Sequence, residues 1–108
     1  SEVTMKDIKV FDQIQMIADH EDMTFFYASD PLCIVCQDMM PQVEALAKEI
    51  DMPIYNIDIT DMPMARGQLN LHTAPVVMLY RQGREVYRQG RFLDLEELKE
   101  VVEDYRQR

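Results

Sequence analysis

In the segment SDPLCIVC, residues 29–36, a turn leads into two cysteines that are separated by two residues. Cys33 and Cys36 are the only cysteines among the 108 residues, which is too few for a disulfide scaffold. The apolar, β-prone run Met23–Tyr27 ahead of them predicts a buried strand. A helical pattern begins near Cys33 and continues to about Ile50. We therefore expect the cysteines at a junction between a strand and a helix.

Helical and strand patterns alternate along the rest of the chain. Apolar residues at steps of three or four indicate helices, and short apolar runs between turn signals indicate strands. We expect a helix within residues 6–20 with room for a short strand before it, a strand at 53–59, a short helix around 64–69, strands at 75–80 and 84–89, and a final helix from residue 95. Asp94 is the expected N-cap of the final helix, and Glu97 occupies its capping-box position.

This order of elements predicts an α/β fold. Helices between consecutive strands imply parallel pairing through right-handed crossovers, and the closing hairpin adds antiparallel pairing. We expect residues 1–108 to form one domain, a mixed central sheet with helices on both faces. A chain of this length can bury a core without disulfides or metals.

Charge and hydropathy exclude several classes of partner. The chain has 11 basic and 20 acidic residues, a net charge of −9, which argues against binding to the phosphate backbone of nucleic acids. No run approaches the roughly 18 apolar residues of a membrane span, and residues 1–4 show neither the basic nor the apolar region of a signal peptide. We expect a cytoplasmic location without membrane or nucleic-acid partners.

A pair of cysteines separated by two residues fits three kinds of site. A structural disulfide gains little stability from closing so short a loop. A closed zinc site needs four ligands, and neither His20 nor His72 has a second ligand at motif spacing, although carboxylates could complete a site. A redox pair accounts best for the position at a helix start, and it needs no metal and no cofactor.

The helix start explains how such a pair would react. Free N–H groups and positive potential at a helix N-terminus stabilise a thiolate. Cys33 is therefore the predicted nucleophile, and Cys36, one turn into the helix, is the predicted resolving cysteine. Leu32, Ile34 and Val35 flank the pair.

In these features the chain resembles the thioredoxin-like proteins over roughly residues 6–106. The resemblance rests on the cysteine pair after a strand, on Pro41 five residues beyond Cys36, on residues 73–75 before a strand, and on Gly83 at the hairpin turn. The Pro-Leu-Cys-x-x-Cys entry is similar to thioredoxin-like proteins of Gram-positive bacteria. The resemblance implies the thioredoxin fold, with Pro41 kinking the helix.

The resemblance also implies a substrate-binding loop. Pro75 matches the family's cis-proline, which packs beside the cysteines. The backbone of Ala74 would pair with an extended segment of the substrate like an added strand, and Thr73 precedes it in the same loop. The implied partners are proteins that carry disulfides, together with an upstream reductase or a low-molecular-weight thiol.

Departures from the family pattern leave one step of the chemistry open. Leu32 stands where typical thioredoxins have tryptophan, and Ile34-Val35 stand where they have Gly-Pro. The buried acid and the nearby lysine of the family are missing from the expected strands. The group that deprotonates Cys36 is therefore undetermined, with Asp30, Asp38 and solvent as candidates.

The sequence is consistent with two functions. The first is a thiol–disulfide oxidoreductase that reduces protein disulfides, because an acidic chain without other cysteines suits a reducing pool. Asp30 and Asp38, if they lie close, would oppose the thiolate and make the pair more reducing, whereas solvated aspartates would not. The second is a docking module of the same fold with a slow or vestigial pair, favoured by the missing acid and lysine.

Overall fold

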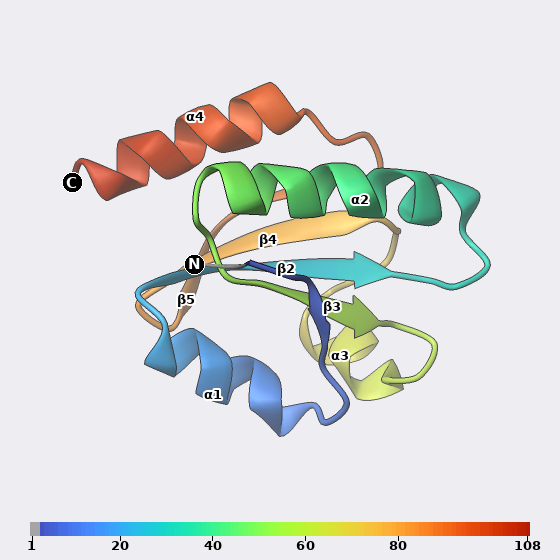
Figure 1. Ribbon diagram of the computed structural model, residues 1–108. Helices are drawn as coiled ribbons and strands as arrows, with labels where there is room; N and C mark the ends of the chain where they lie inside the picture. Colours follow the sequence, from blue (N-terminus) through green and yellow to red (C-terminus); the bar gives the residue numbers. More distant parts are fainter. Residues whose placement is uncertain (1–2) are drawn as a thin grey trace.

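The apolar run before the cysteines forms the central strand of the sheet, β2 (Met23–Ser29). The computed structural model describes residues 3–108. Residues 1 and 2, which belong to the expected 1–108 domain and to the N-terminus expected to lack a signal peptide, lie outside the described residues. The other elements, shown in Figure 1, are β1 (Lys6–Asp7), α1 (Asp12–His20), α2 (Ile34–Glu49), β3 (Ile54–Asp58), α3 (Pro63–Gln68), β4 (Val76–Arg81), β5 (Arg84–Gly90) and α4 (Leu95–Arg106).

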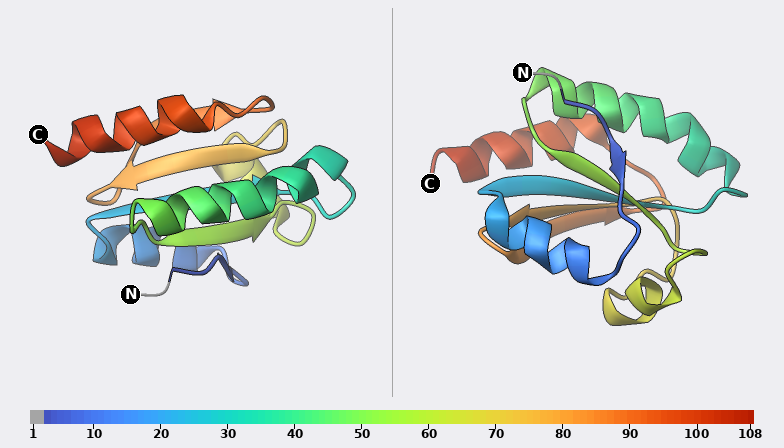
Figure 2. Two further views of the ribbon diagram at one scale, coloured as in Figure 1. Left: turned by 45° about the horizontal axis from the view of Figure 1, so that its top comes forward. Right: turned by 60° about the horizontal axis from the view of Figure 1, so that its bottom comes forward.

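The five strands form one mixed sheet in the order β1-β3-β2-β4-β5. β1, β3 and β2 pair in parallel, whereas β4 pairs antiparallel with both β2 and β5. Helices α2 and α4 cover one face of the sheet, and α1 and α3 cover the other (Figures 1 and 2). The predicted α/β thioredoxin fold, with parallel crossovers and a closing antiparallel hairpin, is confirmed.

Both faces of β2 are buried, which explains its continuous apolar run. Phe25 and Tyr27 point into the core beneath α2 and α4, and Phe26 and Ala28 point into the core on the α1 side. The alternation follows from the two-residue period of a strand. Each side of the sheet therefore has its own apolar core.

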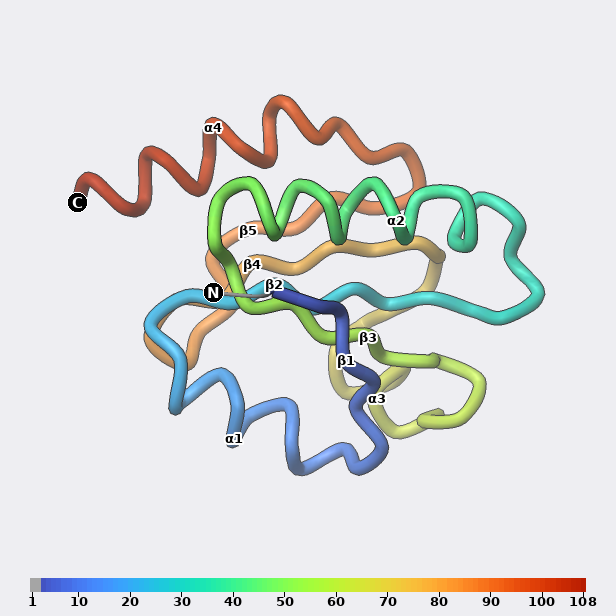
Figure 3. The backbone as a smooth tube through the Cα atoms, viewed as in Figure 1, coloured from blue at the N-terminus to red at the C-terminus, as the bar shows by residue number. Residues whose placement is uncertain are grey.

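Most element boundaries lie within a residue of the prediction, and β2 and the first helix differ by more. β2 continues two residues beyond Tyr27 to Ser29, because Ser29 still pairs with Asp58 of β3. The first helix begins only at Asp12, because residues 6–7 form β1 against β3, as the tube in Figure 3 shows. Among residues 3–108, no helix is long and apolar enough to cross a membrane.

Side chains from β5 fix the start of α4. The predicted N-cap is confirmed, since the Asp94 carboxylate accepts a hydrogen bond from Glu97 N–H at 3.0 Å. The second half of the predicted capping box is wrong. The Asp94 N–H donates to Gln89 Oε1 at 2.8 Å, and the Glu97 carboxylate accepts from Tyr87 and Gln89 instead. A buried glutamine on the adjacent strand meets this N–H before Glu97 can fold back.

Gln89 bonds to both backbone groups of Asp94, because its amide also donates to the Asp94 carbonyl at 2.9 Å. We expect Gln89→Ala to lower the free energy of unfolding by about 2 kcal/mol, since it leaves buried polar groups without partners. Urea denaturation measures this loss. Gln68→Ala, at the exposed end of α3, is the control and should stay within about 0.5 kcal/mol of the original chain. Equal losses in both variants would contradict this role of Gln89.

Candidate active site

The loop after β2 brings Cys33 to the start of α2. Cys33 is the N-cap residue of the helix, and its own N–H donates to the Asp30 carbonyl at 3.0 Å. The Asp30 carboxylate accepts the Leu32 N–H at 2.8 Å, which closes the turn from within. The predicted placement of the pair at a strand-to-helix junction is confirmed.

The two cysteines form a disulfide with Cα atoms 5.2 Å apart. Cys33 is partly exposed and Cys36 is fully buried, so a second protein can reach only the first sulfur. The Cys36 N–H points at Cys33 Sγ from 3.1 Å. In the reduced pair that N–H and the helix N-terminus would favour a thiolate at Cys33. This geometry supports reversible thiol–disulfide exchange.

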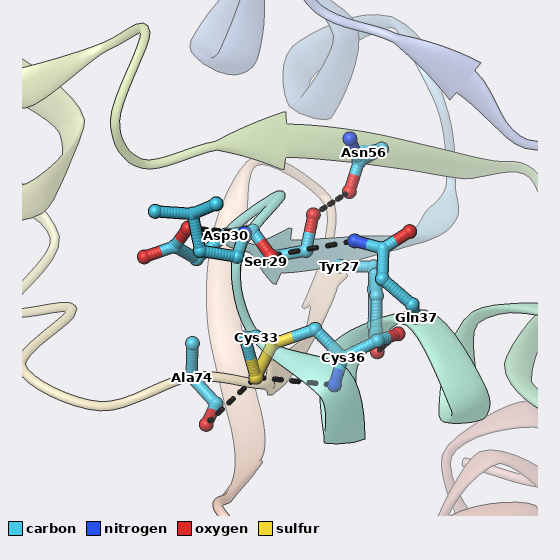
Figure 4. The surroundings of a disulfide bond; sticks show 9 residues. Tyr27, Ser29, Asp30, Cys33, Cys36, Gln37, Asn56 and Ala74 are labelled. Atoms are coloured by element: carbon cyan, nitrogen blue, oxygen red, sulfur yellow. Dashed lines mark hydrogen bonds between the residues drawn. A yellow bond between two sulfur atoms is a disulfide. The ribbon is translucent and has the colours of Figure 1, made fainter.

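The loop before β4 lies directly beside the pair (Figure 4). The Ala74–Pro75 peptide bond is cis, as the family resemblance implied. The Ala74 carbonyl oxygen lies 4.0 Å from Cys33 Sγ, and Pro75 is buried. Thr73 is exposed in the same loop, next to Gly90 of β5. The structure thus places the Ala74 carbonyl beside Cys33, with Thr73 before it and Pro75 after it in the loop.

Exposed apolar residues flank Cys33 in the chain. Leu32 is 90% exposed and Ile34 is 77% exposed, on either side of Cys33, and Val35 follows them at the helix start. Phe92, which is 84% exposed, was not predicted from the sequence. The Arg91 N–H donates to the Pro75 carbonyl at 2.8 Å, so the Phe92 turn lies against the cis-proline loop. The sequence feature that could have indicated it is an aromatic residue in the short turn between an edge strand and the N-cap of a helix.

Tyr27 lies beneath the pair and was also missed. Its side chain is fully buried, and its hydroxyl donates to the Cys36 carbonyl at 2.6 Å (Figure 4). Burial raises the pKa of Tyr27 to about 12. The phenol is therefore neutral below that pH. It lies beneath the cysteines, where typical thioredoxins have a buried acid. The signal was its position six residues before Cys33 on a buried strand.

Polar side chains continue from this layer toward β1. Asn56 of β3 pairs in register with Tyr27, and its amide oxygen accepts from Ser29 Oγ at 2.7 Å. The amide nitrogen donates to Asp7 Oδ1 at 3.1 Å. These groups line a cavity of about 240 Å³ that reaches Gln37 of the first helical turn. Solvent can therefore approach this turn from the β3 side.

The remaining candidates from the sequence lie apart from the sulfurs or face water. Asp38 is exposed on α2, and the Asp30 carboxylate is held by the backbone of its own turn. His20 ends α1 and His72 lies in the loop after α3, both exposed. In the part of the chain that the structure describes, no three His, Cys, Asp or Glu side chains are grouped so that they could hold a metal ion.

Comparisons with known proteins agree on one family. The family model named Thioredoxin matches residues 3–104. Thioredoxin-like protein YdfQ of Bacillus subtilis is 27% identical over 90 residues, which cover 82% of this chain and 80% of that protein. Thioredoxin of Chlamydia trachomatis is 30% identical over 71 residues, which cover 65% of this chain and 70% of that protein.

Solved structures show the same fold at low sequence identity. A thioredoxin variant from Halobacterium salinarum has a TM-score of 0.87 at 20% identity, covering 97% of this chain and 95% of that chain. Oxidised mitochondrial thioredoxin 3 from Saccharomyces cerevisiae has a TM-score of 0.80 at 14% identity, covering 93% of this chain and 94% of that chain.

The raised pKa of Tyr27 predicts a specific alkaline behaviour. An unfolded tyrosine ionises near pH 10, whereas folded Tyr27 ionises at about 12. The unfolded state therefore loses its proton first, and the stability that Tyr27 contributes is complete below pH 10 and is lost as the pH rises through 12. We expect a phenolate absorbance step near pH 12 that is absent in Tyr27→Phe, and a smaller alkaline loss of stability in that variant. Identical titrations of both proteins would contradict the burial of this hydroxyl.

Proposed function

This chain belongs to the thioredoxin family, and we propose that it reduces disulfide bonds of other proteins by exchange at Cys33 and Cys36. The observation that carries the proposal is the unequal exposure of two bonded cysteines at a helix start. Cys33 can meet a substrate, whereas Cys36 is buried and can react only with Cys33. This asymmetry fits a nucleophile and a resolving cysteine within one domain.

The reaction has two exchange steps. The Cys33 thiolate attacks one sulfur of the substrate disulfide, and the other substrate sulfur leaves as a thiolate. The substrate backbone pairs with Ala74 beside Pro75 as an added strand, which aligns its disulfide with Cys33. Cys36 then loses its proton to water and attacks Cys33 Sγ. This attack forms the Cys33–Cys36 bond and releases the second substrate sulfur.

The proposed reducing direction rests on the thiol pool around the protein and not on charge near the pair. Asp30 lies in the loop that presents Cys33, and Asp38 lies two residues beyond Cys36 on α2. Asp38 faces water and the Asp30 carboxylate is held in its own turn, so solvent screens both charges and neither sets the direction. A cytoplasmic thiol pool suits a reducing pair, and an upstream reductase or a small thiol would regenerate its dithiol form.

Trapping with single cysteine variants tests this function. The reduced chain, mixed with a disulfide-bonded protein, should return oxidised while the substrate gains two thiols. Cys36→Ser should accumulate a mixed disulfide through Cys33, because nothing can release it, and Cys33→Ser should give neither product. Intact mass after alkylation measures all three outcomes.

Two other outcomes would overturn the proposal. A chain that stays reduced, or exchanges no faster than a free thiol, would be a docking module. A chain that instead takes electrons from reduced proteins and ends as the dithiol would be an oxidase. Equal trapping by Cys33→Ser would contradict the assigned roles of the two cysteines.

The exposed apolar residues around Cys33 predict a difference between large and small substrates. Phe92→Ser removes an exposed ring next to Arg91, whose N–H is bonded to the Pro75 carbonyl. We expect it to raise the KM for a protein disulfide about tenfold, the effect of losing one well-buried apolar contact, and to leave kcat and the rate with a small aromatic disulfide unchanged. Met16→Ser on α1, where Met16 is 68% exposed, is the matched control. A KM change shared by both variants would contradict a docking role for Phe92.

A further inference from the structure

Tyr27 places one polar group in an otherwise apolar layer beneath the active-site helix. It belongs to β2, in which every residue is buried, and its own side chain is fully buried. A buried phenol normally finds a hydrogen-bond partner. Here the partner is the backbone carbonyl of Cys36, at 2.6 Å. The sheet is thereby attached to one of the two reacting residues.

The hydrogen bond is made next to the position at which α2 lacks one of its own. Pro41 lies inside the helix and has no N–H, so the Gln37 carbonyl four residues earlier receives no helical bond from it. The first turn is therefore attached to the rest of the helix by one bond fewer. The neighbouring carbonyl, that of Cys36, is the one that the Tyr27 hydroxyl fixes to the sheet.

We propose that Tyr27 is a positioning residue that holds Cys36 against Cys33 while the disulfide closes. The proposal rests on the proposed roles of the two cysteines. Cys36 is restrained on both sides, by its N–H on Cys33 Sγ at 3.1 Å and by its carbonyl on the Tyr27 hydroxyl. This restraint raises the effective concentration of the Cys36 sulfur at the Cys33–substrate bond.

The phenol takes no part in the proton transfer. Cys36 gives its proton to water, its sulfur forms the bond to Cys33 Sγ, and the electron pair of the broken bond leaves on the substrate sulfur, which is protonated by water. Tyr27 keeps its own proton because burial raises its pKa to about 12. It therefore donates to the Cys36 carbonyl before, during and after closure.

The test separates the two exchange steps in one experiment. The reduced chain is mixed with an aromatic disulfide whose thiol is coloured, so that attack by Cys33 releases the first thiol and closure by Cys36 releases the second. Tyr27→Phe should slow the second release about fivefold, because the freed Cys36 turn holds its sulfur at the Cys33–substrate bond less often, and leave the first unchanged. The same factor in the closing equilibrium raises the reduction potential by about 20 mV.

A matched control distinguishes positioning from general loosening of the fold. Tyr80 is also a buried tyrosine, but it lies in the core on the α1 side of the sheet. Tyr80→Phe should leave both releases and the potential unchanged. The proposal is overturned if Tyr27→Phe slows both releases alike, slows neither, or behaves like Tyr80→Phe.

Two features keep this test independent of folding and of the proposed function. If Tyr27→Phe does not fold, the Tyr27 hydroxyl proton of the original chain is followed by NMR. A slowly exchanging proton near Cys36 in the reduced protein supports the restraint, and its loss on reduction overturns it. Failure to reduce any protein disulfide would refute the proposed function alone, because the coloured disulfide reports closure without a protein substrate.

Discussion

Complete burial of β2 is the constraint on which the active site depends. The strand pairs with β3 on one side and β4 on the other, and both of its faces lie in apolar cores. Because the strand is fixed in this way, the position of its last residue, Ser29, is fixed as well. The loop from Asp30 to Cys33 is short, so the end of β2 also determines where α2 begins. The geometry of the cysteine pair is thus set by the core.

Strand register then assembles the rest of the site from distant segments. Ala28 of β2 pairs with Val76 of β4, and Val76 pairs with Gly90 of β5. The residues just beyond these pairs therefore meet at one edge, where the cysteine loop, the Ala74–Pro75 loop and the Phe92 turn come together. A slip of one residue would turn every side chain of β4 to the opposite face. The two cores exclude that slip and so protect the site.

The sequence predicted what depends on local pattern. The element order follows from periodicity and turn residues, the Asp94 cap from its place before an apolar stripe, and the position of Pro75 from the family resemblance. It did not predict contacts that depend on register or tertiary proximity. Gln89 displaced Glu97 from the capping box because it lies on the adjacent strand. In the sequence Tyr27 is one more residue of an apolar strand. Its hydrogen bond to Cys36 depends on its position beneath α2, which the sequence pattern does not give.

The proposed mechanism assigns two unlike features of this chain to two different steps. The apolar residues around Cys33 act on encounter, because they are exposed and lose water only when a partner covers them. Tyr27 acts on closure, because it is buried and its hydroxyl bonds to the backbone of the resolving cysteine. Encounter depends on the concentration of the substrate and closure does not. Changes at the surface can therefore alter which proteins are reduced without altering how fast the pair closes.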